Sequence, residues 1–320
     1  MSVWALRVLH IENPAGVASE LRDAQRRSGV DSDVLVTWPN PMKFPVDHEV
    51  PLKGMTLTSL KGMKEVIRIS SGYDVLHVHT GINWKRADLV WLGAIRKRPI
   101  LLHYHGSETR LGYGAYYSSL GDAKVVATPD LLDWWEDAEY VPNPVKDELF
   151  NVPFSPPSGT IKILHMPTDR TIKGTDKVLE AISLLKKDGL AIEFTVLEHV
   201  PHDEAISAIR RSDIVIDWIS DRSVTGIAGI YGKTSIEAMA LGKVAVAFID
   251  DEMRQRYPKD IGVVSPAEPT ALSLAECLKG LITDADRLTT VMRKGREYAL
   301  REHNQNKIVQ TFERIYSAIA

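Results

Sequence analysis

The sequence has 320 residues but a single cysteine, Cys277. One thiol forms no disulfide within the chain and no thiolate cage around a metal ion. Long apolar runs are also missing: stretches such as Leu89–Ile95 are under ten residues long, whereas a membrane-spanning helix needs about 18 to 20. Arg7 interrupts the apolar N-terminal segment and no basic leader precedes it, so we expect a buried first strand rather than a signal peptide. These absences predict a soluble, cytoplasmic protein.

Neither sign of charge is in excess, because 39 basic residues face 42 acidic ones and the net charge is −3. A general nucleic-acid binder needs a positive excess to displace counterions, so we expect no nucleic acid as partner. Hydrophobic residues make up 44% of the chain, which is more than a disordered chain carries. The length exceeds what one core usually serves and predicts two domains.

Short apolar runs alternate with longer amphipathic segments, which is typical of α/β domains with parallel sheets. The expected strands are Leu6–Ile11, Val34–Thr37, Asp74–His79, Ile100–Tyr104, Val125–Thr128, Ile161–His165, Glu193–Leu197, Ile214–Asp217, Val244–Phe248 and Gly262–Val264. The expected helices are Gly16–Ser28, Leu57–Ser70, Ala87–Arg96, Thr175–Lys187, Asp203–Arg211, Thr234–Leu241, Thr270–Leu281, Ala285–Tyr298 and Asn304–Ile319.

The alternation is interrupted by a proline-rich stretch at 140–159, which we interpret as an interdomain linker because proline disfavours regular elements. We therefore expect a first domain over 1–150, a second over 151–300 and a closing helical segment over 301–320. In such sheets ligands bind beyond the carboxyl ends of the strands. Two such domains would face each other across a cleft.

The glycine-rich stretch at 226–247 is the most informative one. Glycines let backbone approach a ligand closely, and Thr234 or Ser235 is placed to cap the following helix, whose first N–H groups would face an anion. Glu237 comes one turn later and suits a pair of ribose hydroxyls. The alternative is an ordinary loop followed by a helix on which Glu237 is a solvated charge.

A second polar stretch, His165–Asp176, follows an expected strand in the second domain. It carries two cations, Arg170 and Lys173, where the sheet would open to the cleft. Cations in that place suit a diphosphate, and arginine can bind one bidentately. The alternative is that both are solvated loop charges.

With these segments in view, the chain resembles the retaining GT-B glycosyltransferases, the family of sucrose- and glycogen-synthase-like and mannosyl-transferring enzymes. Tyr231–Ala247 is similar to the family's YG…EAMALGKPV signature, and 165–176 (HMPTDRTIKGTD) resembles its Arg/Lys phosphate loop. The same order of matches continues through 10–21 (HIENPAGVASEL), 73–79 (YDVLHVH), 103–110 (HYHGSETR) and 141–145 (VPNPV). The likeness spans almost the whole chain.

The resemblance implies a GT-B fold, with two Rossmann-like domains facing a central cleft. The first would bind the acceptor, the second the nucleotide sugar, and the closing helix would cross back to the first. Arg170 and Lys173 would neutralise the diphosphate and Glu237 would hold the ribose. Backbone at Gly232, Lys233, Thr234 and Ser235 would meet phosphate or sugar oxygens, Gly16 would lie near sugar and diphosphate, and His105 near the reacting sugar.

The implied activity moves a sugar from a nucleotide-diphosphate sugar to an acceptor hydroxyl, with retention of configuration and without metal or other cofactor. The leaving phosphate would itself accept the acceptor's proton. A carbohydrate, lipid-linked or small-molecule acceptor would fit polysaccharide or glycoconjugate biosynthesis. The basic cluster at 96–98 leaves peripheral contact with the inner membrane face open, although such clusters are more often solvated helix ends. The pairs His77/His79 and His103/His105 suggest a metal, but we expect none and interpret His77 as a buried, hydrogen-bonded histidine.

The sequence departs from the family at Gly229, which stands where many members have a glutamate eight residues before the ribose glutamate. Asp217 or Asp221 could compensate for it. The Arg170–Lys173 spacing is also two residues shorter than the common form. Two alternatives remain open: a non-catalytic, sugar-nucleotide-binding partner subunit of a transferase, and a sugar-nucleotide 2-epimerase.

Overall fold

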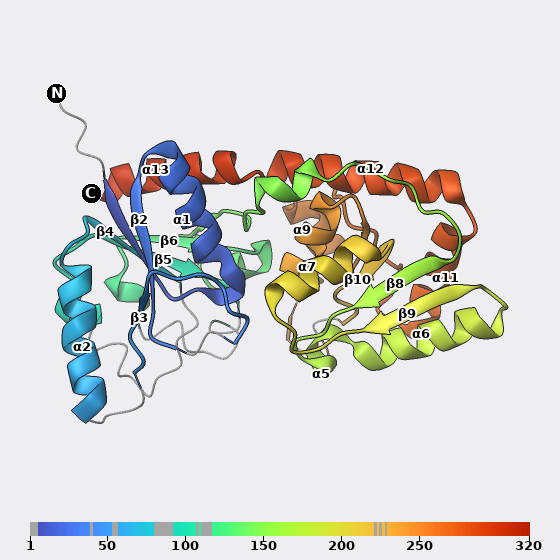
Figure 1. Ribbon diagram of the computed structural model, residues 1–320, viewed down its shortest axis with the longest axis horizontal. Helices are drawn as coiled ribbons and strands as arrows, with labels where there is room; N and C mark the ends of the chain where they lie inside the picture. Colours follow the sequence, from blue (N-terminus) through green and yellow to red (C-terminus); the bar gives the residue numbers. More distant parts are fainter. Residues whose placement is uncertain are drawn as a thin grey trace. The chain divides into compact units, whose positions relative to one another are not determined.

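A computed structural model describes residues 6–38, 41–52, 57–79, 92–106, 109, 117–220, 223, 226–227 and 229–320. The chain divides into two compact units, Met1–Pro144 together with Gln305–Ala320, and Val145–Asn304 (Figure 1). The structure divides the chain after Pro144 and Asn304, a few residues from the boundaries that the sequence predicts after 150 and 300. The first half of the predicted helix Ala87–Arg96 (87–91) and all of Asp221 lie outside the described residues.

The first unit is built on a parallel sheet in the order β3-β2-β1-β4-β5-β6-β7. Its strands are β1 (Arg7–Ile11), β2 (Asp31–Val36), β3 (His48–Glu49), β4 (Val75–His79), β5 (Ile100–Tyr104), β6 (Ala123–Val126) and β7 (Glu139–Tyr140). Its helices include α1 (Val17–Ser28), α2 (Leu57–Ser70) and α13 (Gln305–Ile319), with short 3-10 helices at Pro14–Gly16, Ser118–Leu120 and Pro129–Asp133.

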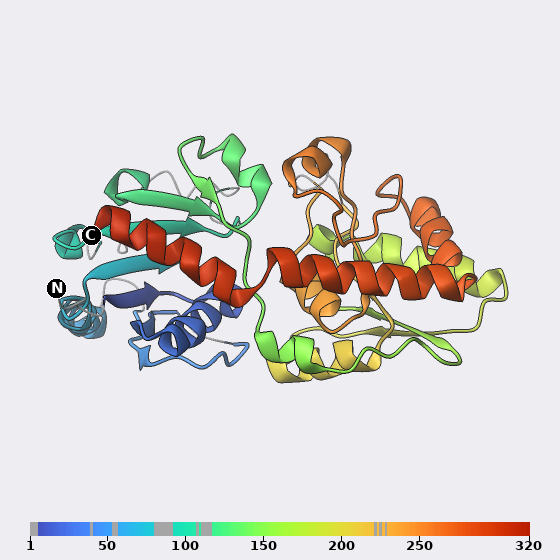
Figure 2. The same cartoon turned by 90° about the horizontal axis from the view of Figure 1, so that it is seen from above.

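Each strand of this sheet points alternate side chains to opposite faces. One face carries a core around Leu9, Leu76 and Leu102 that includes Val66 of α2. The other face carries Val8, Val75, Leu101 and Val125, which α1 and α13 cover. Figure 2 shows α13 lying along the strands of this unit. The helix folds here because its apolar residues recur at helical spacing, at 308, 309, 312, 315 and 316.

The second unit has a smaller parallel sheet in the order β11-β10-β8-β9. The strands are β8 (Ile161–His165), β9 (Ile192–Val196), β10 (Ile214–Ile216) and β11 (Val244–Val246). The helices are α5 (Arg170–Lys173), α6 (Thr175–Lys187), α7 (His202–Arg211), α9 (Lys233–Ala240), α10 (Asp251–Arg256), α11 (Ala271–Ile282) and α12 (Ala285–Glu302). Apolar side chains of α6, α11 and α12 pack with those of the strands into one core.

Two predictions about this unit were wrong. The stretch Gly262–Val264 is not a strand; it makes only an isolated bridge between Val264 and Val246. The loop expected after β8 contains the single helical turn α5, which Asp169 caps by accepting the Ile172 N–H through its side chain. That turn matters because it carries both Arg170 and Lys173.

The predicted linker at 140–159 also contains regular structure. It includes the end of β7 and a 3-10 helix over Asp147–Asn151.

In both sheets the strand order reverses at one point, here called the switch point, because successive strands are added on opposite sides of the first one. In the first unit β2 and β3 are added on one side of β1 and β4 on the other. In the second unit β9 lies on one side of β8 and β10 on the other. Ligands of open α/β sheets bind at the carboxyl ends of the strands beside such a switch point. The functional site is therefore sought after β1 and β4, and after β8 and β10.

The packing of α13 generates a first prediction. Phe312 is fully buried in the core that α13 shares with the sheet. Because Phe312→Ala leaves a cavity there, we expect it to lower the free energy of unfolding by about 3 to 5 kcal/mol, measured by urea titration. The control Gln310→Ala changes an exposed position of the same helix. Equal unfolding midpoints for the two variants would show that α13 is not part of this core.

Candidate functional site

A buried ion pair lies at the switch point of the second unit. Lys173 ends α5, which follows β8, and Asp217 follows β10 directly. The Lys173 Nζ lies 2.5 Å from Asp217 Oδ1, and the two side chains are 8% and 1% exposed. The same Nζ lies 4.1 Å from the centroid of the Trp218 ring, which adds a cation–π attraction. The structure thus holds one cation where a ligand of this fold would bind.

Asp217 also binds the start of α9. Its Oδ2 accepts hydrogen bonds from the Gly232 N–H at 2.8 Å and the Ser235 hydroxyl at 2.7 Å. Burial alone would raise the pKa of Asp217, but the charge of Lys173 and the hydrogen bonds outweigh it and hold the pKa below its usual value. The carboxylate is therefore ionised at neutral pH and connects three predicted site residues.

The predicted capping role of Thr234 and Ser235 is wrong. Helix α9 begins at Lys233, and its N-cap is Gly232, with no side-chain capping bond. The Ser235 hydroxyl donates to Asp217 instead. Lys233 and Thr234 form the half-exposed first turn. A side chain at 232 would crowd the ion pair, because a Cβ there would lie 3.1 Å from Asp217 Oδ2 and 3.4 Å from Lys173 Nζ.

Glu237 is buried on α9, with its Oε1 2.8 Å from the Nε2 of His202, the first residue of α7. The alternative of a solvated helix charge is therefore wrong. A buried carboxylate near a helix start needs a donor, and His202 supplies it. The hydroxyl donors of a ribose would satisfy Glu237 in the same way.

Arg170 lies in a different environment from Lys173, although one helical turn carries both. Its guanidinium is 54% exposed and pairs with Glu198, with Nη2 2.5 Å from Oε2. Hydrogen bonds from two of its nitrogens reach the same carboxylate. Arg170 thus pairs with a carboxylate beyond β9, whereas Lys173 pairs with one beyond β10.

The structure gives a physical reason for the missing glutamate. A Cβ at Gly229 would lie 2.6 Å from the Asp250 nitrogen and 3.0 Å from the Phe248 oxygen, so the backbone leaves no room for a side chain. The Gly229 N–H instead donates to Asp250 Oδ2 at 3.3 Å. Of the two acids predicted to compensate, Asp217 is committed to Lys173 and the start of α9. The carboxylate next to Gly229 is Asp250, which the sequence did not single out.

In the first unit, Gly16 lies between the turn after β1 and the start of α1. Its φ of 75° is left-handed, and a Cβ would collide with the ring of Phe44. Both constraints demand glycine. The position fits the predicted approach of a ligand at the β1/β4 switch point.

The same switch point carries five histidines on the face that α1 and α13 cover: His10, His77, His79, His103 and His105, here called the histidine layer. His105, part-buried just beyond β5, places its Nε2 3.0 Å from Nδ1 of His79. His77 is fully buried and bonds the Tyr316 hydroxyl and His103, which confirms its interpretation as a hydrogen-bonded core residue.

Two triads of the layer bring ligand nitrogens within 4.8 Å of one another, His10/His77/His79 and His79/His103/His105. This spacing suits a metal ion. However, both ring nitrogens of His10, His77 and His79 already lie at hydrogen-bond distance from other side chains. An ion would have to replace these bonds, so the sequence-based expectation of no metal is kept as a prediction.

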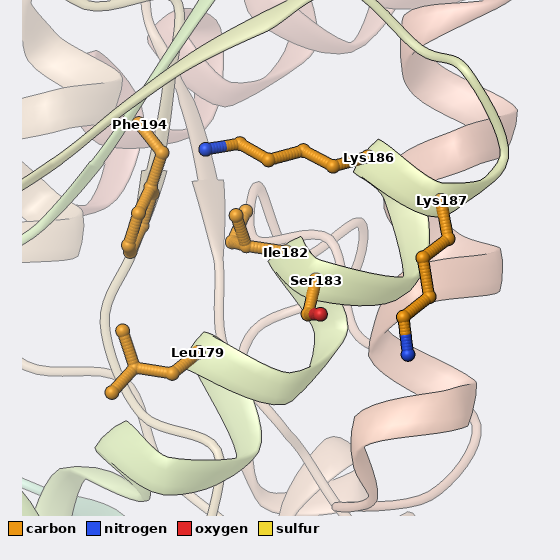
Figure 3. Close-up of a pocket in the computed structure, with 6 residues that line it drawn as sticks. All are labelled: Leu179, Ile182, Ser183, Lys186, Lys187 and Phe194. Carbon is orange, nitrogen blue, oxygen red and sulfur yellow. The ribbon is translucent and has the colours of Figure 1, made fainter.

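A surface pocket lies between α6 and β9 of the second unit (Figure 3). Leu179, Ile182, Ser183, Lys186 and Lys187 of α6 line it together with Phe194 of β9. None of the sequence-predicted site residues contributes to it.

Within the described part of the chain, no helix has the length and apolar character that crossing a bilayer requires.

No family model matches the sequence and no curated protein matches it significantly, whereas solved structures match over 98% of its length. HepE of Anabaena in complex with UDP-glucose superposes with a TM-score of 0.72 at 15% identity, over 98% of this chain and 100% of that chain. Sucrose-phosphate synthase of Thermosynechococcus elongatus gives 0.67 at 15%, over 98% of each chain. An alpha-glucosyltransferase in complex with UDP and DNA gives 0.71 at 11%, over 98% and 100%. The predicted GT-B fold is confirmed.

The buried pair generates a second prediction. Lys173→Ala leaves the Asp217 charge buried without its cation, so we expect a loss of about 3 to 5 kcal/mol in unfolding free energy. Adding Asp217→Asn should restore part of the loss, because the remaining group is neutral. Arg170→Ala, on the exposed side of α5, should leave the urea midpoint nearly unchanged. A double variant less stable than Lys173→Ala would contradict the pairing.

The histidine layer generates a third prediction. Burial lowers the pKa of His10 to about 4 and that of His77, His79 and His103 well below 6.5. The unfolded chain therefore binds protons below pH 6.5 that the folded chain does not. Stability should be full above about pH 6.5 and fall below it, by up to about 1.4 kcal/mol per pH unit for each ring.

Urea midpoints between pH 7.5 and 5 test this dependence. The variant His199→Gln, which changes an exposed histidine, should keep the wild-type profile. A midpoint that stays constant down to pH 5 would show that the layer is not held neutral.

Proposed function

We propose that the protein is a glycosyltransferase that moves a sugar from a nucleotide-diphosphate sugar to an acceptor hydroxyl. The observation that carries the proposal is the cluster at the β8/β10 switch point. There the buried Lys173 is linked through Asp217 to the start of α9. The carboxylate of Glu237 lies on the same helix. Cation, backbone N–H groups and carboxylate are the three partners that a nucleoside diphosphate needs.

In this proposal the Lys173 ammonium faces the diphosphate, with the backbone of Gly232–Ser235 beside it. Asp217 fixes the lysine in place. Glu237 accepts the ribose hydroxyls in place of, or together with, His202. Arg170 adds a second cation if its exposed side chain leaves Glu198, a motion that an exposed ion pair resists little.

The reaction breaks the bond between the anomeric carbon and the diphosphate oxygen and forms a bond to the acceptor oxygen, whose proton passes to the leaving phosphate. Negative charge grows on the diphosphate, where Lys173 and the α9 backbone stabilise it. One such group typically contributes about 2.7 to 4 kcal/mol. Retention of configuration, independence of metal, and His105 and Gly16 near the sugar belong to the proposal.

The solved structures support the choice of donor. HepE was captured with UDP-glucose and with UDP and glucose, and the alpha-glucosyltransferase with UDP-glucose. The acceptor class is left as a carbohydrate, a lipid-linked molecule or a small molecule. The DNA in the alpha-glucosyltransferase complexes belongs to that protein, and the net charge of −3 here favours a different acceptor.

One observation favours a second candidate, a non-catalytic sugar-nucleotide-binding partner of a transferase. Backbone packing at Gly229 excludes the glutamate that many members use. The purified protein alone separates the candidates. Hydrolysis or transfer of the donor sugar supports the enzyme, binding without turnover supports the partner subunit, and an epimerised donor supports an epimerase.

Ligand binding gives the fourth prediction. Among UDP, GDP, ADP and their glucose or mannose derivatives, at least one ligand at 100 times its Kd should raise unfolding free energy by about 2.7 kcal/mol, seen as a thermal shift. Lys173→Ala should abolish that shift and cut turnover about a hundredfold. Arg170→Ala, an exposed cation, should have a smaller effect. No shift with any nucleotide would remove the proposal.

A further inference from the structure

The histidine layer forms two hydrogen-bonded chains that meet at one amide, that of Gln25 in α1. The first chain, the long chain, runs from Gln25 through His10 and His79 to His105. The second, the short chain, runs from Gln25 through the Tyr316 hydroxyl and His77 to His103. Contacts between the ring nitrogens measure 2.9 to 3.1 Å.

The amide fixes which nitrogen carries the proton along the long chain. Gln25 Oε1 lies 2.8 Å from His10 Nε2 and also accepts from the Ser32 hydroxyl. An amide oxygen only accepts, so His10 carries its proton on Nε2 and its Nδ1 accepts from His79 Nε2. A neutral imidazole has one donor and one acceptor, so His79 Nδ1 in turn accepts from His105 Nε2. The proton of His105 is thereby placed on Nε2.

The short chain starts from the other end of the same amide. Gln25 Nε2 donates to the Tyr316 oxygen at 3.1 Å, so the tyrosine proton is directed to His77 Nδ1 at 2.7 Å. His77 then donates through Nε2 to His103 Nδ1. The same protonation pattern, with the proton on Nε2, satisfies both chains. Turning the amide over would reverse every bond in both, so the five tautomers are set together.

Neutral rings are a condition for this pattern, and the structure provides it. His10, His77, His79 and His103 are fully buried, and burial lowers the pKa of all five rings. Of the charged groups near His10, Arg22 lowers its pKa further and Asp47 opposes it. The chains therefore hold no extra proton at neutral pH.

We propose that the Gln25 amide, acting through His10 and His79, holds His105 in one tautomer, with the proton on Nε2 and Nδ1 as its hydrogen-bond acceptor. His79 is then a positioning residue for His105. In this tautomer Nδ1 of His105 can accept a hydrogen bond but cannot donate one. Only the consequence for catalysis rests on the proposed function; the tautomer itself does not.

The tautomer is tested without substrate. In the full-length protein labelled with ¹⁵N-histidine, couplings across the N–H···N hydrogen bonds identify the donor and the acceptor in each pair. We expect His79 Nε2 to donate to His10, His105 Nε2 to His79, and His77 Nε2 to His103. Protons on Nδ1 along the long chain, or opposite directions in the two chains, would overturn the proposal.

The positioning role is tested by a matched pair of variants. His79→Phe and His77→Phe each remove a fully buried imidazole from the same face of β4, but only His79 contacts His105. We expect His79→Phe to lower kcat about tenfold or more with little change in donor KM, and His77→Phe to stay within about twofold. His79→Asn, whose amide oxygen can accept from His105, should restore most of the loss.

Equal kcat for His79→Phe and His77→Phe, with both variants folded by circular dichroism, would remove the positioning role. A protein that turns over no donor at all would instead contradict the proposed function, and the tautomer measurement would still decide the inference. The two failures are thus distinguishable.

Discussion

The structure of the second unit depends on one interaction, the buried pair of Lys173 and Asp217. Neither charge could stay in the interior alone, because desolvation of a single ion costs several kcal/mol. Together they hold the turn α5 against the end of β10, and through Gly232 and Ser235 the same carboxylate holds the start of α9. Three segments far apart in sequence therefore share one electrostatic anchor. The pair thereby fixes the position of the Lys173 ammonium at the carboxyl end of the sheet.

In the first unit, buried polar side chains are stabilised by hydrogen bonds between neutral groups and not by an ion pair. Polar side chains at the carboxyl ends of β1, β4 and β5 are buried under α1 and α13, and neutral imidazoles pair with one another and with Gln25 and Tyr316. Both ring nitrogens of His10, His77 and His79 lie at hydrogen-bond distance from a neighbouring side chain, so the protonation of one ring is coupled to that of the next. The free energy of unfolding falls in acid, because the unfolded chain binds protons that the buried imidazoles of the folded chain do not.

The sequence predicted most helices and strands because their apolar spacing is regular; α2 and α6 occupy the residues expected. It missed α5 because four residues carry no periodicity. It misplaced the roles of Thr234 and Ser235 because the partner of Ser235 is 18 residues away in the chain, and local capping rules cannot include it. Glu237 and Lys173 could be singled out by motif, but their partners His202 and Asp217 depend on which strands lie side by side. Gly229 shows the same limit, since its lack of space is set by the backbone at 248–250.

The two kinds of polar site suit different parts of the proposed reaction. Departure of a nucleoside diphosphate leaves negative charge on phosphate and positive charge on the sugar ring, as in other glycosyl transfers. The cationic anchor after β8 and β10 suits the phosphate. A protonated histidine near the sugar would repel its developing positive charge, whereas a ring kept neutral by burial avoids that repulsion and still accepts a hydroxyl proton in a hydrogen bond. The burial of the histidine layer, which costs stability in acid, is thus the feature that would keep His105 compatible with the transition state at neutral pH.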